Sequence, residues 1–342
     1  MEQLTAAIIG MGNIAPMHVK SLNESGIPIA AVCDKHIGTA KEFASTIRCK
    51  AYTDYEKMLD EGGFQVLHIC LPHHLHARVA IAALQKGYHV LCEKPMATTV
   101  ADAKAMADTA KQTGRTLGLI FQNRFSPGAK LIKQTLAGGE LGPVKSGWFR
   151  VTWSRGKNYY KGSDWRGFWA TEGGGAIINQ SIHCFDLSNH FLGTPTSVNA
   201  NIANRIHPEI EVEDVAEGVI WYGGVPISFF VTTNHPYDVP ASLEIICENG
   251  KAELDGEHAR ITYPDGTEKT ALPDEGAKKR FGMKSYWGVS HIMQIGDFYQ
   301  CLAEGRKHLP DGEEGLRTQV LVNGIYEAAK GGGEALSCLA NS

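Results

Sequence analysis

Short apolar runs alternate with helix-length amphipathic segments over the first 120 residues of this 342-residue chain. The runs predict strands at Leu4–Ile9, Ile29–Cys33, Val66–Leu71, Val90–Cys92 and Leu117–Phe121, with a weaker candidate at Ala51–Tyr52. The segments between them predict helices at Met17–Asn23, Thr39–Ile47, Tyr55–Leu59, Ala77–Lys86 and Val100–Thr113. This alternation is typical of an α/β domain with a doubly wound parallel sheet.

From about Lys145 the pattern changes to an alternation of inward and outward side chains, beginning with Trp148 and Arg150. Further strands are predicted at Val198–Ala203, Glu217–Trp221, Ile227–Thr233, Leu243–Cys247, Lys251–Leu254 and Arg260–Tyr263. Hairpin signals such as Asn249-Gly250 separate several of them, which favours an open, mostly antiparallel sheet in an α+β domain. Helices are predicted at Ala176–Phe191, Val289–Ala303 and Glu313–Ala329. We expect domains at residues 1–121 and 122–342, and the last helices could pack on either.

Composition narrows the function classes. The net charge is −4 and no long basic run occurs, so the chain is not expected to bind nucleic acid or a membrane surface. No apolar stretch approaches the ~18 residues that a membrane span needs, and no signal peptide is evident, so a cytoplasmic location is expected. The eight cysteines form no CxxC pair, which predicts buried free thiols and neither a disulfide framework nor a zinc site.

A glycine-rich turn follows the first predicted strand directly. Gly10-Met11-Gly12-Asn13-Ile14-Ala15 has the GxGxxA spacing in which the glycines allow a tight turn and close approach of a pyrophosphate. Asp34 ends the second strand about 20 residues later, where a carboxylate can bind ribose hydroxyls. Together they predict a Rossmann domain that binds NAD. NADP remains possible, because Lys35 and His36 could soften the repulsion of a 2′-phosphate by Asp34.

The fifth predicted strand ends in Glu93-Lys94-Pro95. Strand carboxyl ends face the cofactor in a Rossmann sheet, so Lys94 is expected near the nicotinamide, with Pro95 restricting its backbone. On local sequence alone, a surface lysine in a turn would be the favoured interpretation of the motif.

These motifs resemble those of the glucose–fructose oxidoreductase and inositol dehydrogenase (Gfo/Idh/MocA) family. The resemblance continues through the second half, in Gln122-Asn123-Arg124-Phe125-Ser126-Pro127, in Gly173-Gly174-Gly175 followed by Asn179, His183 and Asp186, in His291 to Phe298, and in Asp311 to Gly315. It implies a two-domain, NAD-dependent enzyme that oxidises or reduces a carbinol or keto carbon of a sugar, inositol or sugar nucleotide. It also implies a homodimer or homotetramer formed through the open face of the C-terminal sheet.

The resemblance assigns acid/base roles to Lys94 and His183, with Asn179 as a third catalytic candidate. The expected cofactor-binding set is Gly10, Gly12, Asn13, Ile14, Asp34, Pro72, His76, Glu93 and Lys94. The family often has Asp at the position of Asn179, and an amide can orient His183 or a substrate hydroxyl but cannot be a base. Asp186 could steady the His183 imidazole or could serve as a surface or capping residue.

A polar, aromatic segment from Arg155 to Glu172 is the candidate substrate region. Aromatic faces stack on sugar rings and arginine pairs with carboxylates or phosphates. The expected substrate-binding residues are Arg124, Tyr159, Trp165, Arg166, Asn179 and His183. His73, His74 and His76 cluster, but no cysteine or carboxylate beside them completes a metal site, so no metal is expected.

Three other functions remain open. An NAD-dependent glycosidase that oxidises its sugar only transiently would show no net consumption of NAD. A non-catalytic dinucleotide sensor would not need Lys94 and His183. A dehydrogenase acting on a dihydrodiol or an imine would share the site but differ in substrate.

Overall fold

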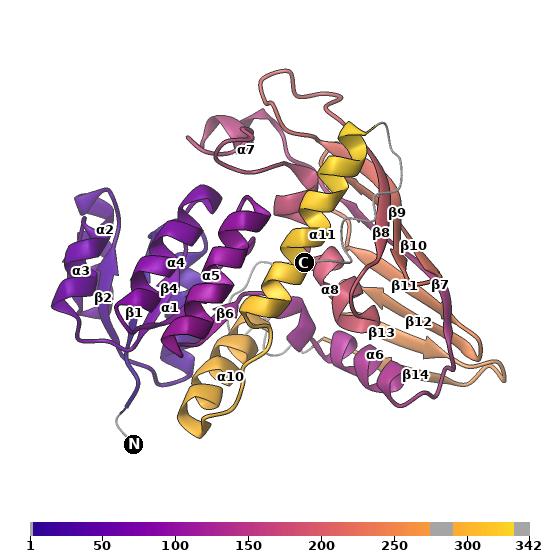
Figure 1. The fold of residues 1–342 in the computed structure, drawn as a ribbon, viewed down its shortest axis with the longest axis horizontal. Helices are drawn as coiled ribbons and strands as arrows, with labels where there is room; N and C mark the ends of the chain where they lie inside the picture. Colours follow the sequence, from indigo (N-terminus) through magenta and orange to yellow (C-terminus); the bar gives the residue numbers. More distant parts are fainter. Residues whose placement is uncertain (1–2, 274–289, 332–342) are drawn as a thin grey trace. The chain divides into compact units, whose positions relative to one another are not determined.

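The computed structural model describes residues 3–273 and 290–331, and it divides the chain into two compact units (Figure 1). The first unit contains residues 1–122 and 291–316, and the second contains residues 123–290 and 317–342. Residues 291–316, which come from far along the chain, group with the N-terminal unit. Val289 and Cys338 lie outside the described residues.

The first unit is built on a six-stranded parallel sheet with the order β3-β2-β1-β4-β5-β6. Its strands are β1 (Ala6–Ile9), β2 (Ile29–Cys33), β3 (Lys50–Tyr52), β4 (Val66–Ile69), β5 (His89–Cys92) and β6 (Leu117–Leu119). This is the strand order of a dinucleotide-binding Rossmann fold, and it confirms the predicted doubly wound sheet. Each predicted strand is present, with ends that move by a few residues at most.

Helices connect these strands as predicted. They are α1 (Ala15–Glu24), α2 (Ile37–Ile47), α3 (Tyr55–Glu61), η1 (His73–Leu75), α4 (His76–Gln85) and α5 (Val100–Thr113). A seventh helix, α10 (Ser290–Glu304), comes from far along the chain and packs its apolar side into the same core. Ile295, Phe298 and Tyr299 of α10 are buried with Leu22 of α1 and Val32 of β2. Burial of these side chains is the physical reason that α10 belongs to the first unit.

The second unit contains an eight-stranded sheet with the order β14-β13-β12-β11-β7-β10-β9-β8. Its strands are β7 (Val144–Thr152), β8 (Ser197–Ala203), β9 (Val215–Tyr222), β10 (Val225–Thr232), β11 (Ser242–Cys247), β12 (Gly250–Asp255), β13 (His258–Thr262) and β14 (Glu268–Ala271). Every neighbouring pair is antiparallel except β7 and β10, so the predicted mostly antiparallel sheet is confirmed. One face buries Phe149 and Phe229, while Trp148 and Phe230 are exposed on the other.

The helices of the second unit are α6 (Pro127–Ala137), η2 (Gln122–Phe125), α7 (Lys157–Lys161), η3 (Ala176–Ser181), α8 (Ile182–Leu192) and most of α11 (Gly312–Lys330). The predicted helix Ala176–Phe191 is two elements, because its first six residues, η3, form a π-helix that continues into α8. The sequence analysis did not identify α6, α7 or β14. Within the described residues, no helix is long and apolar enough to cross a bilayer.

Candidate active site

The glycine-rich turn after β1 has the geometry that a dinucleotide requires. Gly10 has a φ of +88°, and a Cβ atom there would lie 2.5 Å from the carbonyl oxygen of Cys70, so only glycine fits. A Cβ atom on Gly12 would meet no described atom within 4 Å, which leaves that side of the turn open. The helix α1 begins just after Asn13 and Ile14 and presents its N-terminal N–H groups there.

Asp34 lies at the carboxyl end of β2, beside this turn. Its two carboxylate oxygens accept the backbone N–H groups of Met11 and His36, each at 2.9 Å. The contact with Met11 ties the acid directly to the glycine-rich turn. The carboxylate is thus placed at the turn rather than in solvent, as expected for a ribose-binding residue.

Glu93 and Lys94 follow β5, and the Glu93 carboxylate is buried. One oxygen of Glu93 lies 3.0 Å from Nε2 of His18 and 3.6 Å from Nε2 of His291. The other oxygen accepts the backbone N–H of Lys94 at 3.2 Å. Burial by itself would raise the pKa of Glu93, but the hydrogen bonds from His18 and His291 outweigh it and hold that pKa well below its usual range.

The contacts of Glu93 extend through the core of the first unit. Nδ1 of His18 lies 2.8 Å from Nδ1 of His68, and Nε2 of His68 lies 2.9 Å from the hydroxyl of Tyr299 on α10. Burial lowers the pKa of His68 well below its usual value, so His68 is neutral. These contacts are all hydrogen bonds if Tyr299 donates to His68, His68 donates to His18, and His18 donates to Glu93. This buried network was not predicted from the sequence.

His76 connects the segments that follow β4 and β5. Its Nδ1 lies 2.7 Å from the carbonyl oxygen of Pro95, and its Nε2 lies 2.8 Å from that of Leu71. Pro72 immediately precedes η1, whose last residue leads into His76. His73 is buried whereas His74 is exposed, so the three histidines do not converge on one point. The two contacts of His76 indicate that it holds the segments around Leu71 and Pro95 together.

Two of the three glycines before η3 are required by close contacts in the second unit. A Cβ atom on Gly174 would lie 1.9 Å from the Tyr326 hydroxyl, and one on Gly175 would lie 2.0 Å from the Glu213 carbonyl oxygen. The buried Glu213 carboxylate accepts the N–H groups of Gly175 at 2.9 Å and Ile177 at 2.8 Å. Burial raises the pKa of Glu213 to about 7 against the effect of these N–H groups. Glu213 thereby anchors the start of the π-helix.

Asn179 sits on this π-helix in a hydrogen-bonded cluster. Its Nδ2 lies 2.6 Å from Oε1 of Glu172 and 3.2 Å from the hydroxyl of Tyr159. The Tyr159 hydroxyl also accepts a hydrogen bond from Nε2 of Gln180 at 3.0 Å. Glu172 is buried, and its other carboxylate oxygen accepts the N–H of Gly167. Sequence reasoning did not identify Glu172, whose one visible signal is its position directly before the three glycines.

Two of the predicted substrate residues lie beside this cluster. The guanidinium of Arg166 stacks over the rings of Tyr159, at 4.4 Å, and Trp165, at 4.9 Å. Both Trp165 and Arg166 are half-buried. His183 follows η3 in the first turn of α8 and is also half-buried. The structure thus brings Tyr159, Trp165, Arg166 and Asn179 into one cluster.

Arg124 does not join that cluster. Its guanidinium makes two hydrogen bonds of 2.7 Å to the carboxylate of Asp186, and both side chains are buried. Asp186 also accepts the hydroxyl of Thr318 at 3.1 Å. Asp186 is therefore an ion-pair partner in the interior rather than a surface residue, and the charge of Arg124 is already neutralised.

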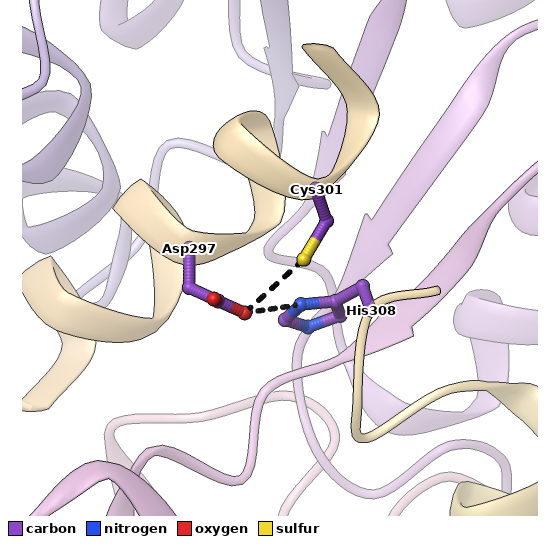
Figure 2. A group of neighbouring side chains, drawn as sticks. All are labelled: Asp297, Cys301 and His308. Carbon is purple, nitrogen blue, oxygen red and sulfur yellow. Dashed lines mark hydrogen bonds and ion pairs between the residues drawn. The ribbon is translucent and has the colours of Figure 1, made fainter. Parts of the chain in front are cut away.

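A separate group in the first unit combines three metal-ligating residue types, Asp297, Cys301 and His308 (Figure 2). An Asp297 oxygen lies 3.0 Å from Nδ1 of His308 and accepts the Cys301 thiol at 3.5 Å. Arg306 donates to the Cys301 sulfur at 3.0 Å and lies 3.7 Å from Asp297. Because a guanidinium already supplies positive charge to the thiol and carboxylate, we interpret the group as a tie between α10 and the segment that follows it.

The fold and the glycine-rich turn define the class as a Rossmann-type dinucleotide-binding protein. Residues 4–121 match the GFO_IDH_MocA description "Oxidoreductase family, NAD-binding Rossmann fold", and residues 129–253 match "GFO/IDH/MocA C-terminal domain". The chain therefore belongs to the Gfo/Idh/MocA family of NAD-dependent oxidoreductases. This confirms the resemblance, the enzyme class and the NAD cofactor expected from the sequence.

Relatives of this chain include dehydrogenases named for carbohydrate substrates. D-glucoside 3-dehydrogenase of Escherichia coli is 31% identical over 210 residues, which is 59% of this chain and 58% of that protein. Levoglucosan dehydrogenase of Pseudarthrobacter phenanthrenivorans is 25% identical over 96% of this chain and 97% of its own. The WlbA dehydrogenase of Bordetella pertussis, solved with NADH and UDP-GlcNAcA, is 27% identical, covers 98% of each chain and superposes with a TM-score of 0.86.

Proposed function

We propose that the protein oxidises, or in reverse reduces, a ring carbon of a sugar, an inositol or a sugar nucleotide. The main support for this proposal is the position of Glu93 and Lys94, which lie at the same edge of the sheet as the glycine-rich turn. In a parallel sheet the carboxyl ends of β1, β2 and β5 share one edge, so Gly10, Asp34 and Lys94 face one ligand. The substrates named for the three relatives support the carbohydrate class.

The proposed cofactor site consists of Gly10, Gly12, Asn13, Ile14, Asp34, Pro72, His76, Glu93 and Lys94. Gly10 and Gly12 leave room for the pyrophosphate. The Asp34 carboxylate would accept hydrogen bonds from the ribose hydroxyls, either in place of the Met11 N–H or together with it. His76 joins the segments around Pro72 and Pro95, which gives the loops after β4 and β5 a common support. NAD, when bound, supplies the hydride acceptor.

The proposed acid/base residues are Lys94 and His183. Lys94 has a fixed backbone, because its N–H donates to the buried Glu93 carboxylate. A histidine has an ordinary pKa near neutrality and can exchange a proton at physiological pH. In oxidation the hydroxyl proton of the carbinol passes from its oxygen to one of these two groups, while the carbinol carbon gives up a hydride. The Asn179 amide cannot ionise or take up the proton in this step, so its proposed role is to orient neighbouring groups.

The test is a pair of substitutions assayed on a panel of sugars, inositols and sugar nucleotides with NAD. Removing an acid/base residue costs roughly 100- to 10,000-fold in rate, so Lys94→Ala and His183→Ala should each lower kcat by at least the smaller factor. Affinity for NADH, measured by calorimetry, should stay nearly unchanged. Near-wild-type turnover by Lys94→Ala contradicts the proposal, and turnover without net NADH formation identifies a transient-oxidation glycosidase instead.

We also propose a homodimer or homotetramer formed through the outer face of the eight-stranded sheet. Trp148, Phe230 and Ile246 are 37%, 43% and 39% exposed on neighbouring strands β7, β10 and β11. A group of large apolar side chains on one sheet face is typical of a protein interface. Phe230→Glu should lower the molar mass measured by light scattering, whereas Ile206→Glu, at an exposed apolar position outside these strands, should not.

A further inference from the structure

Four cations lie between residues 155 and 166, and the structure separates one of them from the others. Arg155 is neutralised by Asp238, with nitrogen–oxygen distances of 2.9 and 3.3 Å. Lys157 and Lys161 are exposed to solvent on α7. Arg166 is half-buried, and no described carboxylate forms an ion pair with its guanidinium. A half-buried cation without an acid partner is costly unless a ligand supplies one.

The Arg166 guanidinium is held in place by aromatic rings rather than by acceptors. It lies over the Tyr159 and Trp165 rings, which orient the planar group without satisfying its N–H donors. The Nε atom is buried, and it has no hydrogen-bond acceptor among the residues that the structure describes. A buried donor without an acceptor destabilises the protein until one is provided.

A second donor lies beside Arg166. The Tyr159 hydroxyl accepts amide N–H groups from Asn179 and Gln180, which together occupy its two lone pairs. With the Gln180 amide in this orientation, the hydroxyl proton points away from both amides and can be donated to a ligand. Because a carboxylate can only accept, Glu172 fixes the orientation of the Asn179 amide, with its nitrogen toward Glu172 and Tyr159.

We propose that Arg166 and Tyr159 bind a carboxylate group of the substrate, so that the enzyme acts on an acidic sugar such as a uronate or a sugar nucleotide of a uronate. One carboxylate oxygen would accept a hydrogen bond from the guanidinium, and the other would accept one from the tyrosine hydroxyl. The carboxylate and the guanidinium are both planar, which suits this pairing. Glu172 and Asn179 are positioning residues in this arrangement, because they act through Tyr159. The inference rests on the proposed carbohydrate dehydrogenase function and specifies its substrate.

The test uses matched ligands that differ in one substituent. UDP-GlcNAcA is compared with UDP-GlcNAc, and D-glucuronate with D-glucose, while D-glucose 6-phosphate serves as a different anion. Binding to the NADH complex is measured by calorimetry with both the wild type and Lys94→Ala. The Lys94→Ala arm makes the result independent of turnover, so failure of the catalytic proposal and failure of this inference are distinguishable.

We expect at least one acid to bind about tenfold or more tightly than its neutral partner, since a hydrogen bond to a charged group contributes at least that factor. Arg166→Gln should abolish this preference while changing the affinity for the neutral partner less than about threefold. Tyr159→Phe should reduce the preference. Arg166→Lys keeps the positive charge but loses the planar guanidinium, so this variant should retain only part of the preference for the acidic ligand.

Lys161→Gln is the matched control, since it removes one exposed cation of the same segment. Equal losses for Lys161→Gln and Arg166→Gln would show a diffuse charge effect and overturn the inference. So would binding of neither acid, equal affinity for acid and neutral partner, or a preference for D-glucose 6-phosphate over D-glucuronate. Thermal unfolding of each variant confirms that it is folded before binding is compared.

Discussion

The side-chain amide nitrogen of Asn179 lies 2.6 Å from a carboxylate oxygen of Glu172, and both side chains are buried. The family that the sequence resembles often has an aspartate at the position of Asn179. In this chain an aspartate there would place two carboxylates in direct contact, which burial makes costly unless one holds a proton. The amide of Asn179 is therefore the compatible partner of the Glu172 carboxyl group, whose oxygens both accept hydrogen bonds.

This relationship predicts that Asn179→Asp impairs the protein. At pH 8 we expect a lower melting temperature and a kcat reduced by about tenfold or more, with recovery toward pH 5–6 as the pair takes up a proton. The double variant Glu172→Gln with Asn179→Asp restores one carboxylate and one amide and should recover most of the loss. Calorimetric melting and pH profiles of kcat measure both effects, and full activity of the single variant at pH 8 would refute the interpretation.

A second prediction concerns cofactor choice. The wild type should bind NADH more tightly than NADPH, because a 2′-phosphate would approach the Asp34 carboxylate. Asp34→Ala should narrow that difference by about tenfold or more. It also removes the acceptor for the N–H groups of Met11 and His36, so Asp34→Asn serves as a second variant that removes the charge but keeps one acceptor oxygen. Tighter binding of NADPH than NADH by the wild type would contradict the role of Asp34.

Acid stability provides a third prediction, from the lowered pKa of Glu93. A carboxylate whose folded-state pKa lies below its unfolded value of about 4.3 stabilises the protein above that value, and the contribution disappears as pH falls through the folded-state pKa. His18→Asn removes a donor to Glu93, so Glu93 should take up its proton at higher pH and acid unfolding should begin at higher pH.

Far-UV circular dichroism is the suitable measurement, because the tryptophans of the described residues, at positions 148–221, all belong to the second unit. Tyr299→Phe is the control, since it removes a hydroxyl two contacts away from Glu93 and should shift the transition less. An unchanged acid transition in His18→Asn would show that His18 does not hold Glu93 ionised.

The Arg124–Asp186 pair gives a fourth prediction. Breaking a buried ion pair by removing one partner destabilises a protein by about 3–5 kcal/mol, because the other charge is left buried. Asp186→Asn and Arg124→Met should therefore each lower the melting temperature sharply, and Arg124→Met with Asp186→Leu should recover much of the loss. If Arg124→Met instead raised KM at an unchanged melting temperature, Arg124 would be a substrate ligand after all.

Sequence patterns predicted the strands of both sheets because their signals are local. A run such as Ile29–Cys33 is apolar throughout since both faces of a parallel sheet are covered, and the alternation around Trp148 reflects a sheet with one covered face. The helix α6 also had a local signal that we did not use. Ser126 caps it by accepting the N–H of Ala129, and Pro127 occupies its first turn.

The contacts that organise the site could not be predicted in the same way, because their partners are distant in sequence. Glu213 reaches Gly175 across 38 residues, and His68 reaches Tyr299 across 231. No local pattern distinguishes such a glutamate or histidine from one on the surface. In the same way, the motif around Arg124 does not reveal that Asp186 neutralises its charge.

The packing of α10 has a consequence for synthesis of the chain. A ribosome completes all six strands of the Rossmann sheet long before it reaches Ile295, Phe298 and Tyr299, which fill part of that sheet's core. Until then the emerging N-terminal segment exposes the apolar surface that α10 later covers, and His68 has no tyrosine hydroxyl to contact. The N-terminal half therefore cannot reach its final packing during translation of its own residues, and its maturation waits for the last sixth of the polypeptide.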